Sequence, residues 1–338
     1  MAGKSNRQVV LRSRPVGWPK ASDFELVERP VPTPGLGEML IRTIWLSLDP
    51  AMRGWVSEAK NYSEPVRLGT VMRGFTVGEI VASNHLDYAV GEIVTSASGW
   101  QEYAVSDGKD IVRKVDPAVA PISTALGPLG HTGMTAYIGL LDIGQPKPGE
   151  TVVVSTAAGA VGSVAGQIAK IKDCRAVGTA GSDGKVDLCL KEFGYDACIN
   201  YKTSPDIGAA LRQACPNGID VYFDNVGGAI LDAVLDQLNV GARIVICGTI
   251  GADASPTGPR VERRLLVARA RMQAFVILDY FDRFPQGIRQ LAEWMGAGRL
   301  RYREDIVDGL EKAPETLVRL LEGGNLGKQL VRVGAAPA

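Results

Sequence analysis

Apolar and polar positions follow different patterns in the first third of the chain and in its middle. Before about residue 120, short apolar runs such as Met39–Leu46, Gly78–Val81 and Glu92–Thr95 are separated by Pro, Gly and Asp. Three prolines at 30, 32 and 34 precede Gly35 and Gly37, which is typical of a loop. The first third is therefore predicted to consist of short strands and irregular segments.

From Thr151 onward, strand signals alternate with helical ones. Thr151–Ser155 is a compact apolar run, and apolar residues then recur at helical spacing from Val161 to Ala169. A second helix is expected over Asp183–Phe193. This alternation predicts an α/β fold with a doubly wound parallel sheet. The remaining strands are expected at Arg175–Thr179, Cys198–Tyr201, Asp220–Asp224, Ala242–Cys247 and Arg271–Ile277.

Composition and charge narrow the class of protein. The 338 residues are 46% hydrophobic and 22% charged, which is usual for a globular protein. Lys+Arg and Asp+Glu both number 37, so no nucleic acid or anionic membrane is expected as partner. No apolar run approaches the roughly 18 residues of a membrane-spanning helix. Near the N-terminus only Val9–Leu11 is apolar, too short for a secretory signal, and we expect a cytoplasmic protein.

The residues that could bind a metal are few. No cysteine precedes Cys174, the only histidines are His85 and His131, and no Cys-x-x-Cys pair occurs. A zinc site needs several such ligands brought together, so no metal is expected. The five cysteines are an odd number without paired spacing, and they are expected to be reduced.

A glycine-rich bend joins the first strand of the middle region to its helix. The stretch Ala157–Gly162 fits Gly/Ala-x-Gly-x-x-Gly, with Ala157 in place of the first glycine. Gly159 would let the backbone approach a diphosphate, and Gly162 would let the helix pack closely on the strand. The N-terminus of that helix would offer its free N–H groups to the phosphates. The strand before the bend and the helix after it supply the context of a dinucleotide site.

The second strand of this region bears on which nicotinamide cofactor is bound. NAD enzymes usually place Asp or Glu at its end to bind the ribose 2′-hydroxyl. Here no carboxylate occupies that end, and Ser182 with Asp183 is typical of a helix cap. Lys185 is then available for a 2′-phosphate, or is a solvated surface lysine. The pattern favours NADP(H).

Several segments resemble the zinc-independent medium-chain dehydrogenase/reductases, in the curcumin reductase and prostaglandin reductase (alkenal reductase) branch. The resemblance covers nearly the whole chain and implies that a Rossmann domain at 126–297 is inserted in a β-rich, partly open-barrel, GroES-like catalytic domain at 1–125 and 298–338. It also implies a homodimer. The motifs that carry it are Leu48–Gly54, Val71–Gly74, Gly133–Tyr137, Ala157–Gly162, Asp224–Gly228 and Gly324–Lys328.

The same resemblance implies a set of cofactor contacts. The diphosphate would lie at the glycine-rich bend, and Lys185 with Tyr201 would hold the 2′-phosphate. The remaining contacts would line the rest of the cofactor cleft. The full set is Gly159, Ala160, Val161, Gly162, Lys185, Tyr201, Asn225, Cys247, Gly248, Thr249, Ile250, Phe275, Val276, Ile277 and Asn325.

The implied reaction is hydride transfer from NADPH to the β-carbon of an α,β-unsaturated ketone or aldehyde. Negative charge then develops on the carbonyl oxygen, so the site needs hydrogen-bond donors there and a proton source for the α-carbon. A neutral tyrosine can serve both purposes. The candidates are Tyr280, just past the sixth strand, and Tyr62, in a loop of the first domain; either could instead be an ordinary half-buried aromatic residue.

Two departures from the family leave the substrate open. Many relatives carry Tyr where this chain has Ala51, and the loop Gly251–Arg260 is shorter than in close relatives. An NADPH:quinone oxidoreductase of the same superfamily is the nearest alternative. A non-catalytic NADP-binding homologue is another, although the segments around Asn225 and Asn325 argue against it.

Overall fold

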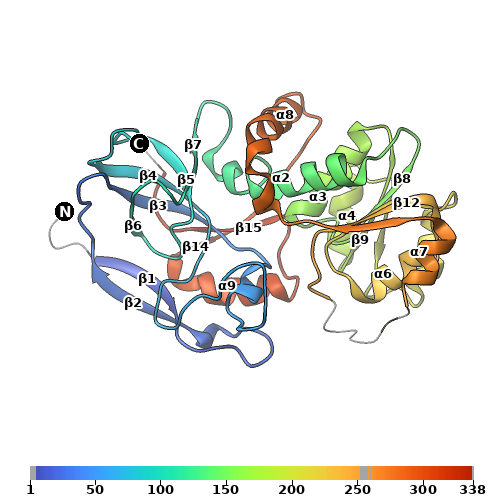
Figure 1. Ribbon diagram of the computed structural model, residues 1–338, viewed down its shortest axis with the longest axis horizontal. Coiled ribbons are helices and arrows are strands. Elements are labelled where there is room, and N and C mark those ends of the chain that lie inside the picture. The colour runs from blue at the N-terminus through green and yellow to red at the C-terminus, as the bar shows by residue number, and fades with distance from the viewer. Residues whose placement is uncertain (1–4, 252–257, 259, 337–338) are drawn as a thin grey trace. The chain divides into compact units, whose positions relative to one another are not determined.

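The computed structural model describes residues 5–251, 258 and 260–336, and the chain forms two compact units (Figure 1). The first unit comprises Met1–Leu126, Glu304–Asn325 and Gln329–Ala338. The second comprises Gly127–Arg303 and Leu326–Lys328. Among the described residues, no helix combines the length and apolar character that a membrane crossing requires.

The first unit is built around a mostly antiparallel sheet in the order β14-β15-β3-β4-β5-β7, with β6 also paired to β3. β3 is buried along almost its whole length, as its apolar run predicts. Ile44, Val77, Ile93 and Leu330 from neighbouring strands form one apolar cluster in this unit. The strands are β1 (Ser5–Leu11), β2 (Phe24–Pro30), β3 (Met39–Ser47), β4 (Thr76–Ser83), β5 (Ile93–Ser96), β6 (Tyr103–Ser106), β7 (Ile111–Val115), β14 (Glu304–Asp308) and β15 (Lys328–Arg332), and the helices are η1 (Ala21–Asp23), α1 (Met52–Trp55), η2 (Ile122–Leu126), η6 (Leu310–Lys312) and α9 (Ala313–Leu321).

The second unit is a six-stranded parallel sheet in the order β10-β9-β8-β11-β12-β13. Numbered within the unit, this order is 3-2-1-4-5-6, which is that of the Rossmann fold. The predicted fold class is therefore confirmed. Its strands are β8 (Thr151–Val154), β9 (Arg175–Ala180), β10 (Ala197–Asn200), β11 (Ile219–Asp224), β12 (Leu238–Ile246) and β13 (Arg271–Ala274), and its helices are α2 (His131–Ile138), η3 (Gly139–Gly144), α3 (Ala160–Ile171), α4 (Asp183–Lys191), α5 (Ile207–Ala214), α6 (Gly228–Leu235), α7 (Glu262–Ala268), η5 (Ile277–Arg283) and α8 (Phe284–Gly296).

Helices cover both faces of the parallel sheet. α2, α3 and α8 form one layer (Figure 1). α5 packs beside α6 in the other. Val153, Val177 and Tyr222 from three strands share a fully buried cluster with Leu211 of α5 and Val234 of α6. Burying one such aliphatic side chain contributes roughly 1.5–3 kcal/mol to the free energy of folding.

Because the six strands are parallel, the loops after their carboxyl ends gather at one edge of the sheet. The strand order reverses between β8 and β11, and ligands of open α/β sheets bind outside such a switch point. One strand is shorter than its sequence predicts: β13 ends at Ala274, so the prediction of a strand to Ile277 is wrong by three residues. The chain leaves the ladder there because Ile277 begins the 3-10 helix η5. Phe275, Val276 and Ile277 consequently lie at this edge.

Candidate functional site

The bend after β8 folds without a glycine at its first turn. Thr156 takes the left-handed backbone conformation, with φ of 54°, a position where glycine is the usual residue. Ala157, which replaces the first glycine of the motif, is buried and donates its N–H to the carbonyl of Thr179 at 3.0 Å. Gly178 of β9 leaves room for its methyl group, because a Cβ at 178 would lie only 2.6 Å from that of Ala157.

The last glycine of the bend is required by packing. A Cβ at Gly162 would overlap the carbonyl oxygen of Thr156. The carbonyl of Gly162 accepts a 2.7 Å hydrogen bond from the hydroxyl of Tyr195, which is buried. Tyr195 also fills the space beside Gly166, where a Cβ would overlap its ring. Two glycines and one tyrosine thus fix the first turns of α3 against the sheet.

The amino end of α3 fits a phosphate group. α3 begins at Ala160 after the N-cap residue Gly159, and no side chain caps it. The N–H groups of its first turn and the positive end of the helix dipole are therefore available to an anion. Gly327 lies against the same bend: its N–H donates to the carbonyl of Ala158 at 3.1 Å, and it pairs with Gly159 in a parallel bridge.

A second polar cluster lies at the ends of β9 and β10. A Cβ at Gly181 would lie 3.0 Å from the hydroxyl of Tyr201 and 3.4 Å from Cε of Lys202. Lys185 is in the first turn of α4, where its N–H donates to the carbonyl of Ser182 at 3.1 Å. Burial raises the pKa of Tyr201, so its hydroxyl stays protonated and can donate a hydrogen bond. These residues supply donors that suit a phosphate.

The first polar residues after β9 cap α4 and bind β10. Ser182 is the N-cap of α4, and its side chain accepts from the N–H of Lys185, which confirms the predicted cap. Asp183, the next residue, accepts a 2.7 Å hydrogen bond from the side-chain amide of Asn200. Its carboxylate is thereby engaged in holding β10 to α4.

Asn225 is held by the bend after β8. Its N–H donates to Oγ of Ser155 and its side-chain amide donates to the carbonyl of Ser155, both at 2.7 Å. Oδ1 of Asp224 accepts from the hydroxyl of Tyr222 at 2.9 Å and from the N–H of Gly227 at 2.8 Å. This network fixes the turn after β11 relative to the turn after β8.

Asp224 also forms hydrogen bonds with the turn after β12. Its carbonyl accepts from the N–H groups of Cys247 at 2.8 Å and Gly248 at 3.1 Å, and Thr249 and Ile250 continue that turn. Burial raises the pKa of the Asp224 carboxyl, although the N–H groups at Oδ1 act in the opposite direction. Its Oδ2 is buried and finds no hydrogen-bond partner among the described residues. Burial, together with the nearby Asp224, raises the pKa of the Cys247 thiol to about 12.

The two candidate tyrosines differ in their surroundings. Tyr280, in η5, is half-buried and departs from helical geometry, with φ of −123° and ψ of 24°. Its ring stands edge-on to that of Phe275 at 6.2 Å between centroids. Tyr62 belongs to the first unit, is 56% exposed, and its N–H donates to Oδ1 of Asn61 at 2.7 Å. Asn325, also of the first unit, is buried.

Four residues that fix the turns at this edge of the sheet were not assigned by the sequence prediction. They are Ser155, Tyr195, Tyr222 and Asp224. A polar residue at the carboxyl end of an apolar strand is a signal that could have identified two of them, since Ser155 directly follows β8 and Asp224 is the last residue of β11. Of the loop Gly251–Arg260, the segment 252–257 and residue 259 lie outside the described residues.

Across the part of the chain that the structure describes, no three His, Cys, Asp or Glu side chains gather as metal ligands would. His85 lies in a turn, where its Nδ1 accepts from the N–H of Asp87 and its ring contacts Tyr88. All five cysteines are free thiols.

Comparisons with known proteins match nearly the whole chain. Residues 7–114 match the family model described as an N-terminal domain of oxidoreductase, and residues 160–293 the model described as zinc-binding dehydrogenase. YfmJ of Bacillus subtilis is 50% identical, covering 97% of this chain and 98% of its own. The NADPH-dependent curcumin reductase of Escherichia coli is 47% identical, covering 97% of each. The structure of CurA from Vibrio vulnificus in complex with NADPH is 46% identical over 98% of this chain and 100% of that chain, with a TM-score of 0.92.

Proposed function

Because the chain belongs to the zinc-independent medium-chain dehydrogenase/reductases, in the branch of the curcumin, alkenal and prostaglandin reductases, we propose that it reduces the carbon–carbon double bond of α,β-unsaturated ketones and aldehydes with NADPH. The fit of the Rossmann edge to a dinucleotide phosphate carries this proposal. That edge combines the uncapped start of α3, the packed Gly162 and the donors around Gly181. NADP(H) is the cofactor of this enzyme, as it is of its named relatives.

In the proposed complex, each turn at the sheet edge binds a different part of the cofactor. Ala160, Val161 and Gly162 bind the diphosphate through backbone N–H groups. Gly159, whose own N–H donates to the carbonyl of Thr156, lets the diphosphate approach the backbone closely. Lys185 and Tyr201 bind the 2′-phosphate, the former as a cation and the latter as a neutral donor. The bound cofactor supplies the hydride. The other contacts are assigned to Asn225, Cys247, Gly248, Thr249, Ile250, Phe275, Val276, Ile277 and Asn325.

The protein contributes donors for the substrate carbonyl. An enone that gains hydride at its β-carbon carries negative charge on the carbonyl oxygen, and a preorganised hydroxyl stabilises that charge. We assign this role to Tyr280, whose ring is held edge-on by Phe275 just past the last strand. Tyr62 is the second candidate, as donor or as the acid that protonates the α-carbon.

Single hydroxyl deletions test the assignment of the tyrosines. Tyr280→Phe is expected to lower kcat about 10²-fold, because removing one oxyanion donor has an effect of that order. Its affinity for NADPH, measured by fluorescence titration, should stay within about twofold, since the ring is retained. Tyr62→Phe is the parallel variant at the second candidate. Full turnover in both variants would exclude these hydroxyls from the mechanism.

The position of hydride delivery tests the reaction itself. With NADPH deuterated at C4 and an enone as substrate, NMR of the product is expected to show deuterium on the β-carbon and an intact carbonyl. An allylic alcohol deuterated at the carbonyl carbon would contradict the proposed reaction. A quinone reduced faster than any enone would instead support the quinone oxidoreductase alternative.

We also propose that the enzyme is a homodimer in the cytoplasm. β13 is the last strand of its sheet, and three of its four residues are exposed. Leu266 and Val267 on the adjacent α7 are 76% and 63% exposed. An open strand edge beside exposed apolar residues suits pairing with a second chain. Sedimentation equilibrium is expected to give twice the 35.9 kDa chain mass, and a monomer at micromolar concentration would contradict the dimer.

A further inference from the structure

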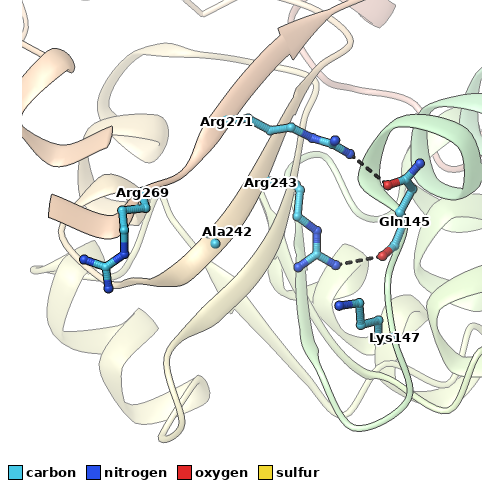
Figure 2. A pocket seen from close by; sticks show the side chains of 7 residues that line it. Gln145, Lys147, Ala242, Arg243, Arg269 and Arg271 are labelled. Carbon is cyan, nitrogen blue, oxygen red and sulfur yellow. Dashed lines mark hydrogen bonds between the residues drawn. The ribbon is translucent and has the colours of Figure 1, made fainter. Parts of the chain in front are cut away.

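A cationic pocket lies in the second unit, and none of its lining residues has a role in the proposed reaction. Its volume is about 230 Å³. Among the described residues, the pocket is lined by four cationic side chains and by no acidic one (Figure 2). The lining residues are Gln145, Lys147, Gly241, Ala242, Arg243, Arg269 and Arg271.

Two of the arginines are held side by side by the sheet. Arg243 of β12 and Arg271 of β13 are direct partners in the parallel register, so like charges lie opposite one another. Figure 2 shows both side chains directed toward Gln145. Arg243 donates to the carbonyl of Gly144 at 2.8 Å, and Arg271 to that of Ile143 at 2.5 Å. These bonds cap the carboxyl end of the helical segment η3.

The capping bonds leave the charge of this cluster largely uncompensated. Glu150 pairs with Arg243 and is the one carboxylate bonded to the four cations among the described residues. Lys147 and Arg269 are exposed, and the charge of Lys147 also acts on Glu150. The cluster therefore retains a net charge of about +3. A concave surface lined by charge of one sign concentrates ions of the opposite sign.

We propose that this pocket binds a small polyanion bearing phosphate or carboxylate groups. A guanidinium binds both kinds of group through paired N–H donors, which Arg269 can supply, and Lys147 adds a compact charge. Arg243, whose N–H groups donate to Gly144, Gln145 and Glu150, contributes its charge instead. The volume corresponds to about eight water molecules at ~30 Å³ each, which suits pyrophosphate or a tricarboxylate and is below the usual size of a pocket for a larger ligand.

The location makes this site distinct from the proposed cofactor site. Arg271 is the first residue of β13, whereas Phe275 follows the carboxyl end of that strand. Arg243 precedes Cys247 in the same way along β12. The polyanion and NADPH would thus occupy different places along the same two strands, and they should bind without competing.

The test is calorimetric titration of pyrophosphate and, separately, citrate into the protein saturated with NADPH, which keeps the proposed phosphate loop occupied. Binding is expected with a dissociation constant below about 1 mM at physiological salt. The double variant Lys147→Gln/Arg269→Gln should weaken it about tenfold or more, because each lost charged donor removes a strong hydrogen bond. Both side chains are exposed in the single chain, so its folding should be preserved. Binding of one anion alone would identify the phosphate or the carboxylate source.

Arg289→Gln provides the matched control, since Arg289 is an exposed cation of α8 outside the pocket. It should leave the affinity within about twofold. Equal affinity in the double variant and the unmodified protein would overturn the proposal. So would the absence of heat with both anions, or binding that disappears at physiological salt. Failure of NADPH to bind would contradict the proposed function only, because the comparison between variants still assigns the anion site.

Discussion

Ser155, Asp224 and Tyr195 show how single buried polar groups position the candidate site. Each forms bonds to backbone or side-chain atoms far away in the sequence, such as Tyr195 to Gly162 and Ser155 to Asn225. The sequence predicts Gly162 and Asn225 because both belong to recognisable motifs. The partners that hold them depend on strands brought together only by folding, so local pattern does not reveal them.

Discrimination between NADPH and NADH is expected to depend on Lys185 and Tyr201. Lys185→Gln and Tyr201→Phe each remove a donor from the proposed 2′-phosphate site. A hydrogen bond to a charged group contributes about 1.5–3 kcal/mol, so the affinity for NADPH should fall about 10- to 150-fold. The affinity for NADH, which lacks the phosphate, should not change.

Lys191→Gln is the control for these variants, because Lys191 lies on the same helix and pairs with Asp187 on the surface. It should alter neither affinity. Fluorescence titration with both cofactors provides the measurement. Parallel losses for NADPH and NADH would instead mean that these side chains support the fold of the domain.

The Cys247 thiol is expected to resist electrophiles at neutral pH. Its pKa of about 12 keeps it protonated, and only the thiolate reacts readily with alkylating agents or enones. Its alkylation rate by iodoacetamide, followed by mass spectrometry, should rise about tenfold per pH unit from 7 to 10, because the thiolate fraction grows in that proportion below the pKa. Glutathione in the same mixture is the reference. A plateau near pH 9 would show an ordinary thiol.

At the scale of elements, the second unit could be predicted and much of the first could not. Each strand–helix pair of the Rossmann sheet is local in sequence, so periodicity finds β8 to β13 with small errors at their ends. Strands β1 and β2 pair Ser5 with Pro30 across a long connection, and β15 pairs Leu330 with Ser47. Short strands joined by such distant pairings carry a weak local signal.

Close packing at the start of α3 makes the bend after β8 sensitive to one methyl group. Gly162→Ala would force the new Cβ against the Thr156 carbonyl. Overpacking of this kind is expected to lower the free energy of unfolding by about 1–3 kcal/mol and to weaken NADPH binding by displacing the first turn of the helix. Urea unfolding, with and without NADPH, measures both effects.

Gly184→Ala is the matched control for that substitution. Gly184 is also in the first turn of a helix, and no heavy atom lies within 4 Å of a Cβ built there. The variant should be neutral or more stable by up to about 1 kcal/mol, owing to the helix propensity of alanine. If both variants behaved alike, steric contact at Gly162 would not be the cause.

At the scale of the whole molecule, the fold and the cofactor site are assigned by different kinds of observation. The parallel sheet follows from alternating strand and helix patterns. The reaction is inferred from a resemblance that extends over nearly the whole chain, because no cluster of catalytic side chains identifies it within the described residues. The motifs that carry the resemblance do not specify a substrate, so substrate preference could not be predicted from them.

The most direct test of the account is the initial rate of reduced-cofactor oxidation with a panel of enones, enals and quinones, measured with NADPH and NADH in parallel. We expect conjugated ketones or aldehydes to accelerate NADPH oxidation. The kcat/KM for NADPH should be at least about tenfold higher than that for NADH, because this ratio corresponds to about 1.4 kcal/mol of binding free energy from the 2′-phosphate. Oxidation of NADPH that no conjugated carbonyl accelerates, or equal use of NADH, would contradict it.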